Sequence, residues 1–275
     1  MFQFPLSVPR LILLSGAYLL KKLENNWGNL FQKVKKLLFL LANLICQLKI
    51  LTYHSIMLTQ IINAKILTPQ GWLKDGSVLM RDNKILEVTN CDLAVIGAEL
   101  IDAKGMYVVP GGVEIHCHGG GGGDFMEGTE EAFRTAINAH MKHGTTSIFP
   151  TLSSSTVPMI EAAAETCTKL MAEPDSPVLG LHLEGHYLNI KMAGGQMPEN
   201  IKDPDPNEYI PIVEKWNCIK RWDAAPELPG AMQFGKYITG KGIVASVAHT
   251  QAEYEDIRSA WDSGYTLATH FYNAM

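Results

Sequence analysis

The chain has 275 residues, of which 47% are hydrophobic and 19% are charged, and its formal net charge is −5. These values exclude an intrinsically disordered chain and provide enough apolar residues for one large domain and a small one. The acidic balance also argues against a nucleic-acid-binding surface.

The first 56 residues differ from the rest of the chain. They hold seven Lys and Arg residues against one Glu, and basic clusters interrupt two apolar runs, Leu11–Leu20 and Leu37–Gln47. Each run is about half of the ~20 residues that a transmembrane helix needs. We expect that residues 1–56 come from a start assigned too early, with the domain beginning at Met57. A membrane-surface helix is the alternative.

Residues 57–109 are typical of a small β domain. Short apolar runs, Ile61–Leu67, Ser77–Met80 and Ile85–Val88, are separated by turn-forming residues such as Pro69 and Gly71. This pattern predicts a small antiparallel unit.

After Pro110 the pattern changes to β-like runs that alternate with helix-like segments. The predicted strands are Val113–His118, Thr146–Phe149, Val178–Glu184, Cys218–Ala224, Ile243–His249 and Tyr265–His270. The predicted helices are Thr129–His143, Val157–Met171, Asn207–Trp216, Gly230–Thr239 and Glu253–Ser263. This alternation indicates a parallel α/β sheet, either a (β/α)8 barrel or a doubly wound sheet.

The first predicted strand of this region ends in His116-Cys117-His118. Because side chains alternate along a strand, the two imidazoles point the same way and can reach one metal ion. Cys117 then points to the opposite face, where we expect a packed core thiol. Taken alone, the motif also fits two polar residues at a strand end.

Three further ligand-type residues end later strands: Glu184, His249 and His270. In parallel barrels the carboxyl ends of the strands converge on the active site, so these side chains are expected to meet. Nitrogen and carboxylate ligands without thiolate suit Zn²⁺, or Fe²⁺, Co²⁺ or Mn²⁺, acting as a Lewis acid.

Longer motifs resemble the amidohydrolase superfamily. They are Pro110-Gly-Gly-Val-Glu-Ile-His-Cys-His118, Gly144-Thr-Thr-Ser-Ile-Phe-Pro-Thr151, Gly180-Leu-His-Leu-Glu-Gly185 and Thr269-His-Phe-Tyr-Asn-Ala-Met275. Within the superfamily the chain is most similar to the N-acetylglucosamine-6-phosphate deacetylases, from Met57 to Met275. The resemblance implies a (β/α)8 TIM-like barrel, truncated here after about strand six, beside a small N-terminal β-sandwich.

The resemblance also implies a site and a reaction. Glu184, His249 and His270 would hold one divalent ion, and His116 and His118 could hold a second. The reaction would be hydrolysis of N-acetylglucosamine 6-phosphate to glucosamine 6-phosphate and acetate. The family's proton-transferring Asp belongs to the eighth strand, so we expect no catalytic residue before Met275.

This sequence matches part of the set of residues with which the family binds its sugar substrate. The family's substrate-binding positions correspond to Gly195, Gln196, Asn273 and Ala274. Two positions depart from the family pattern: His186 stands where many members have proline, and Gln196 stands where many have histidine. A glutamine amide can still donate a hydrogen bond to a sugar hydroxyl or an acetyl oxygen.

Two local features have less specific interpretations. Gly119–Gly123 could admit a sugar or its phosphate close to the backbone, although a mobile loop is the simpler interpretation. His182 shares a strand face with Glu184, and a role beside the ligands or in the barrel core is expected.

The alternatives to the deacetylase are another amide or cyclic-amide hydrolase of the same superfamily and a fragment without activity. A homodimer is expected for the complete protein. The five cysteines, an odd number without a Cys-x-x-Cys pair, indicate a reducing, cytoplasmic compartment.

Overall fold

The computed structural model describes residues 36, 38, 41, 58–82, 84–91 and 95–275. Apart from three positions, the leader expected over residues 1–56 lies outside the described residues. Among the described helices, none combines the length and the apolar character needed to cross a membrane. The chain divides into two compact units, Met1–Val109 and Pro110–Met275.

The first unit contains a five-stranded sheet. Its strands are β1 (Leu58–Thr68), β2 (Gly71–Arg81), β3 (Lys84–Thr89), β4 (Glu99–Asp102) and β5 (Tyr107–Val108). The order is β3-β2-β1-β4, with β5 also paired to β1. Ala64, Ile66, Val78 and Ala103 form its buried apolar centre.

The prediction that this unit is wholly antiparallel was wrong. The β1–β2 and β2–β3 pairs are antiparallel, but β4 and β5 pair with β1 in parallel. Tight turns such as the one between Thr68 and Gly71 leave a clear signal in the sequence, whereas a parallel partner needs a longer crossover that leaves none.

The second unit is built on one parallel sheet of six strands that curls as a half-barrel. Its strands are β6 (Gly112–Cys117), β9 (Thr145–Leu152), β10 (Leu181–Leu183), β11 (Ile219–Ala224), β12 (Val244–Val247) and β13 (Tyr265–Ala268). Their order in the sheet is β13-β12-β11-β10-β9-β6, which is the chain order reversed. Each strand therefore lies beside its neighbour in sequence, as strand-helix alternation predicts.

Strand β10 is shorter than the predicted range Val178–Glu184. The Leu179 amide donates to Ile148 of β9, whereas the Leu181 amide donates to the carbonyl of Cys218 on the other side. The change of partner interrupts the ladder and leaves Val178 in an isolated bridge with Ile148.

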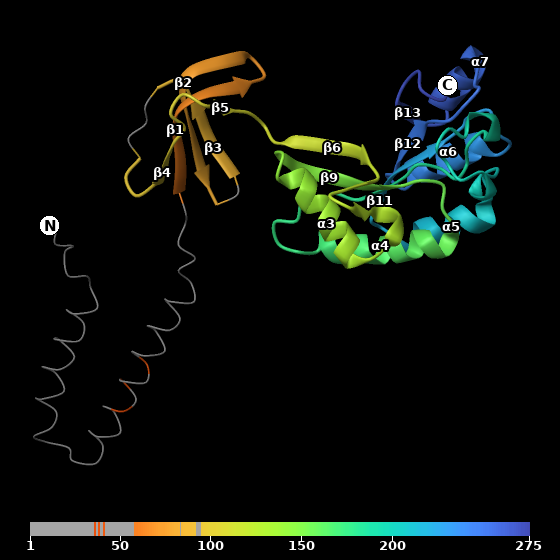
Figure 1. The fold of residues 1–275 in the computed structure, drawn as a ribbon, viewed down its shortest axis with the longest axis horizontal. Helices are drawn as coiled ribbons and strands as arrows, with labels where there is room; N and C mark the ends of the chain where they lie inside the picture. Colours follow the sequence, from red (N-terminus) through yellow and green to blue (C-terminus); the bar gives the residue numbers. More distant parts are fainter. Residues whose placement is uncertain (1–35, 37, 39–40, 42–57, 83, 92–94) are drawn as a thin grey trace, which may run out of the picture. The chain divides into compact units, whose positions relative to one another are not determined.

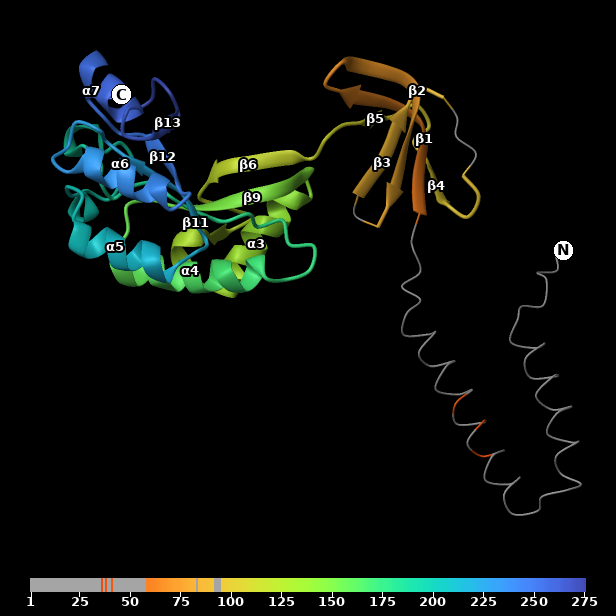
Figure 2. The same cartoon turned by 180° about the vertical axis from the view of Figure 1, so that it is seen from behind.

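Helices connect the strands: α3 (Glu130–Met141), α4 (Val157–Met171), α5 (Pro206–Lys215), α6 (Ala231–Gly240) and α7 (Tyr254–Trp261). Short 3-10 turns cover Phe125–Glu127 (η1), Ile190–Met192 (η2) and Pro198–Asn200 (η3). Figures 1 and 2 show α3, α4 and α5 along one side of the sheet. The core between helices and sheet includes Phe133, Ile148, Ile160, Leu181, Trp222 and Phe234, all buried.

The glycine run after His118 forms a tight hairpin, β7 (Gly119–Gly120) and β8 (Gly123–Asp124). A Cβ atom on Gly123 would lie 2.4 Å from the carbonyl oxygen of Ala132 in α3, and one on Gly119 would lie 2.2 Å from the Gly123 oxygen. Close backbone packing therefore requires Gly119 within the hairpin and Gly123 against α3.

Candidate metal centre

Four histidines surround one carboxylate at the carboxyl ends of the strands. His116 lies in β6, and His118 directly follows that strand. Glu184 directly follows β10, and His249 and His270 each lie two residues beyond β12 and β13. Because the strands are parallel, residues at the same end of different strands meet at one edge of the sheet.

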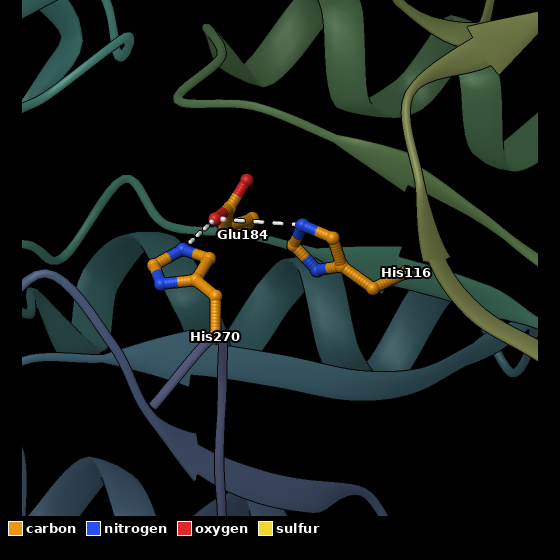
Figure 3. Close-up of side chains that lie close together, drawn as sticks. All are labelled: His116, Glu184 and His270. Carbon is orange, nitrogen blue, oxygen red and sulfur yellow. Dashed lines mark hydrogen bonds and ion pairs between the residues drawn. The ribbon is translucent and has the colours of Figure 1, made fainter. Parts of the chain in front are cut away.

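The imidazole Nε2 atoms all face Glu184. Its Oε1 atom lies 2.8 Å from His270, 3.1 Å from His249 and 3.7 Å from His116. Its Oε2 atom lies 3.0 Å from His118. Figure 3 shows Glu184 between His116 and His270, whose ring nitrogens point at the same carboxylate oxygen.

The surroundings of Glu184 favour its charged form. The residue is 2% exposed, and burial alone raises the pKa of its carboxyl. Hydrogen bonds from His118 and His249, with the charge of the neighbouring imidazoles, outweigh burial and hold the pKa of Glu184 well below its ordinary value. A carboxylate is therefore present at neutral pH.

The histidines respond differently to the same carboxylate. Burial lowers the pKa of His116 to about 4, against the attraction of Glu184. The hydrogen bond with Glu184 raises the pKa of His118. For His249, burial lowers the pKa, but hydrogen bonds with Glu184 and the Met192 carbonyl outweigh it and the net pKa is raised. The His116 ring is thus neutral at pH 7.

Main-chain carbonyls set the orientation of two rings. The Nδ1 atom of His249 lies 2.7 Å from the oxygen of Met192, and that of His270 lies 2.9 Å from the oxygen of Asn273. A carbonyl only accepts, so each Nδ1 donates to its main-chain partner, and Nε2 is the ring atom that faces Glu184 and could bind a metal ion.

That orientation gathers imidazole Nε2 atoms about the Oε1 atom of Glu184. Such an arrangement is repulsive unless a proton or a cation lies between the atoms. One ligand atom from each of His116, Glu184 and His270 lies within 4.8 Å of the other two, so the three residues could hold one metal ion. Tetrahedral ligands at 2.0–2.1 Å from Zn²⁺ lie about 3.4 Å apart, in the range of the separations found here. The donor set fits a divalent ion.

His249 and His270 have unusual backbone geometry. Their φ angles are +46° and +33°, in the left-handed region that non-glycine residues seldom occupy. Residues held there by their surroundings cluster at functional sites. Here the Asn273 amide donates to the carbonyl of His270, so the turn after β13 supports the position of the ring.

A second group of ligand-type residues lies deeper in the sheet: His116, His182 and Asp223. The Nε2 atom of His182 lies 2.9 Å from Asp223, and its Nδ1 atom lies 3.1 Å from the hydroxyl of Thr151. His182 and Asp223 are fully buried. Arg221 donates from Nε to Asp223 over 3.2 Å, so a protein cation already faces this carboxylate.

The four positions expected to bind a substrate are placed as follows. The buried Gln196 accepts a hydrogen bond of 2.6 Å from the Ser154 amide, and its Nε2 atom lies 3.4 Å from that of His249. Gly195 is exposed, with open space where a Cβ would lie. The main-chain oxygens of Asn273 and Ala274 accept from His270 Nδ1 and the Thr250 amide.

His186, which departs from the family pattern, is buried, and its Nε2 atom lies 2.6 Å from Glu208. Cys117 packs against the core, and burial raises the pKa of its thiol to about 12. Both side chains thus have partners within the fold.

Sequence reasoning missed several residues around the ligands. Ser153 lies 3.2 Å from His118 Nδ1, and the Met192 carbonyl orients His249. Arg221 and Thr269 belong to a buried polar network. Arg221 could have been found, because it stands two positions from Asp223 and therefore shares one face of β11 with it.

The chain was compared with known proteins. No family model matches it. It is 30% identical over 216 residues to N-acetylglucosamine-6-phosphate deacetylase of Haemophilus influenzae, covering 78% of this chain and 56% of the relative. It is 26% identical over 226 residues to N-acetylgalactosamine-6-phosphate deacetylase of Escherichia coli O157:H7, covering 79% and 58%.

Solved structures are similar as well. The deacetylase of Mycobacterium smegmatis, in complex with N-acetyl-D-glucosamine 6-phosphate, matches with a TM-score of 0.72 and 29% identity over 80% of this chain and 57% of that one. The chain thus spans somewhat more than half the length of the relatives that it matches. These relatives do not favour the alternative of another amide or cyclic-amide hydrolase.

Proposed function

We propose that this chain, whose sequence and fold fit the amidohydrolase superfamily, carries the metal centre of a deacetylase that hydrolyses N-acetylglucosamine 6-phosphate. The products are glucosamine 6-phosphate and acetate. The observation that carries the proposal is the arrangement of four imidazole Nε2 atoms around the single buried carboxylate of Glu184. The similarity to named deacetylases supports the choice of substrate.

In this proposal Glu184, His249 and His270 hold one divalent ion, and His116 and His118 can hold a second one that Glu184 bridges. Oε2 of Glu184 faces His118, whereas Oε1 faces His249, His270 and, at 3.7 Å, His116, and the separate partner of Oε2 supports a bridging role. Zn²⁺ is the preferred ion, with Fe²⁺, Co²⁺ or Mn²⁺ as alternatives. When bound, such an ion withdraws electron density from an amide carbonyl and lowers the pKa of water.

The residues around the ions position the sugar. The Gln196 side-chain oxygen is engaged by Ser154, so its amide N–H groups beside His249 remain to donate to the acetyl oxygen or a sugar hydroxyl. Gly195 leaves room for the ring. The main-chain oxygens of Asn273 and Ala274 each accept one hydrogen bond within the chain, and a carbonyl oxygen has a second lone pair that can accept from the sugar. None of these residues is assigned the proton transfer to the leaving amine.

We also propose an architecture, an oligomeric state and a cellular location for the protein. The parallel sheet has β13 and β6 at its two edges, and Val113 and Ile115 of β6 are exposed apolar residues, which supports a (β/α)8 barrel. The mixed sheet of the first unit is proposed as part of a β-sandwich. A homodimer is proposed by analogy with the family. A cytoplasmic location is supported by four free cysteines among the described residues.

Acetate release tests the proposed reaction. The protein is expressed from its own gene, loaded with Zn²⁺ and given N-acetylglucosamine 6-phosphate, its galactosamine epimer or an unphosphorylated N-acetylhexosamine. We expect metal-dependent acetate release that is fastest with the first sugar and is lost in Glu184→Gln. Faster release from the epimer would reassign the substrate, and hydrolysis of unrelated amides alone would contradict the proposal.

A further inference from the structure

We propose that Arg221, Asp223 and Thr269 form an internal clasp that positions His116 and His270 for metal binding. The inference rests on the proposed metal centre, and it assigns a positioning role to three residues that do not themselves bind the ion. The three residues are called the Arg221 clasp below.

The guanidinium of Arg221 reaches three partners. Its Nε atom donates to Asp223 Oδ1 over 3.2 Å, and its Nη2 atom donates to the Thr269 hydroxyl over 2.6 Å. Its Nη1 atom donates to the main-chain oxygen of Ile115 over 3.0 Å. The Thr269 hydroxyl in turn donates to Asp223 Oδ2, which closes the network.

Asp223 lies on the same strand as Arg221, but the other two partners lie at distant strands. Ile115 precedes His116 on β6, and Thr269 precedes His270 after β13. These two strands are the opposite ends of the sheet order, whereas Arg221 lies on β11, one of the two central strands. Because the sheet curls, one side chain spans its interior and holds the residue next to one histidine at each edge.

Burial makes this geometry specific. Asp223 is 0% exposed, Thr269 2% and Arg221 6%. A buried carboxylate and a buried guanidinium are tolerated only when their donors and acceptors are satisfied, so the partners must keep their positions. The planar, five-donor guanidinium fixes directions in a way that an ammonium group cannot. A buried ion pair adds little net stability, but it can select one arrangement of the strands.

The charge of Arg221 also explains why no ion is assigned to the second group of ligand-type residues, His116, His182 and Asp223. Asp223 faces the guanidinium of Arg221 as well as His182. A divalent ion bound by His116, His182 and Asp223 would have to lie close to that positive charge. The clasp therefore leaves Glu184 as the carboxylate available to a metal.

Cobalt titration of the full chain tests the clasp. Thr269→Val removes the hydroxyl at similar volume, whereas Thr269→Ser retains it. Tyr265→Phe is the matched control, because it deletes another buried hydroxyl near β13, which donates to the Ala231 oxygen over 2.8 Å. Affinity is measured by competition with a chelator, ligand geometry by the visible Co²⁺ spectrum, and stability by urea unfolding.

We expect Thr269→Val to weaken Co²⁺ binding by about 10–100-fold and to alter the spectrum, as removal of groups that orient metal ligands does. Thr269→Ser should restore the spectrum and most of the affinity. Tyr265→Phe should lower stability while leaving the affinity within about twofold of the original chain, as expected for a residue without contact to the ligands.

Several outcomes would overturn the clasp. These are an unchanged affinity and spectrum in Thr269→Val, a failure of Thr269→Ser to restore them, or an equal loss in Tyr265→Phe. If Thr269→Val does not fold, Arg221→Lys is measured in its place. This variant keeps the positive charge but loses the planar, multidentate guanidinium. Unchanged Co²⁺ binding in Arg221→Lys would also refute the clasp. A chain that binds no Co²⁺ before any substitution contradicts the proposed metal centre itself.

Discussion

The Nε2 atom of His270 lies 2.8 Å from Oε1 of Glu184, while Nδ1 of the same ring lies 2.9 Å from the main-chain oxygen of Asn273. The carbonyl requires a proton on Nδ1, which leaves Nε2 as the ring atom that can bind a cation beside Glu184. A divalent cation between Nε2 and Oε1 would be coordinated by both atoms. The same relationship holds for His249, with Met192 in the place of Asn273.

Zinc should therefore stabilise the folded chain. A ligand that binds only the native state raises the free energy of unfolding by about 2.7 kcal/mol at 100 times its dissociation constant. We expect thermal unfolding monitored by circular dichroism to shift to higher temperature with Zn²⁺, and the shift to disappear in His270→Ala. Mg²⁺ serves as the control ion, since it prefers oxygen ligands and should give little shift. Equal shifts with both ions, or a shift retained in His270→Ala, would contradict this assignment.

The glycine hairpin is predicted to be intolerant of side chains. Gly123→Ala places a methyl group 2.4 Å from the Ala132 oxygen, and overpacking of this kind costs about 1–3 kcal/mol. Gly240→Ala, at the end of α6, meets no atom within 4 Å and should stabilise the chain by about 0.4–1 kcal/mol. Urea unfolding of both variants measures whether each substitution lowers or raises the free energy of unfolding. A neutral Gly123→Ala would show instead that the loop is loose and does not pack on α3.

Glu208 should make stability depend on acid pH. Its hydrogen bond with His186 and its ion pair with Lys202 lower the pKa of Glu208 from 4.5 to about 2, and burial opposes this only in part. Because the folded pKa is lower than the unfolded one, the contribution is complete above about pH 5 and is lost as the pH falls toward 2. The stability difference between the chain and Glu208→Gln should therefore shrink between pH 5 and pH 3 in urea unfolding. A difference that stays constant over this range is the contrary result.

The convergence of the five candidate ligands could be predicted because their positions follow from strand periodicity. His116 and His118 share a face by alternation, and Glu184, His249 and His270 each stand at or just beyond the end of an apolar run. Parallel strands bring such ends together whatever the lengths of the connecting helices. Helix α4 has the predicted bounds, Val157–Met171, since its pattern is strongly periodic and Pro158 lies at its start.

What surrounds the ligands could not be predicted from local patterns. The carbonyls that orient His249 and His270 come from Met192 and Asn273, and a main-chain group carries no sequence signature. The contact of Arg221 with Ile115 spans 106 positions and depends on the curl of the sheet. The parallel pairing of β4 with β1 was missed for a similar reason, because no turn motif marks a crossover.

X-ray absorption at the zinc edge tests the central claim most directly, because it identifies the atoms bound to the ion. For the Zn²⁺-loaded chain we predict nitrogen and oxygen ligands at about 2.0–2.1 Å with imidazole scattering, and loss of bound zinc in Glu184→Gln. A sulfur shell at about 2.3 Å would place the ion on a cysteine such as Cys117 instead. Either that result or the absence of bound zinc would contradict a metal centre built on Glu184 and its four histidines.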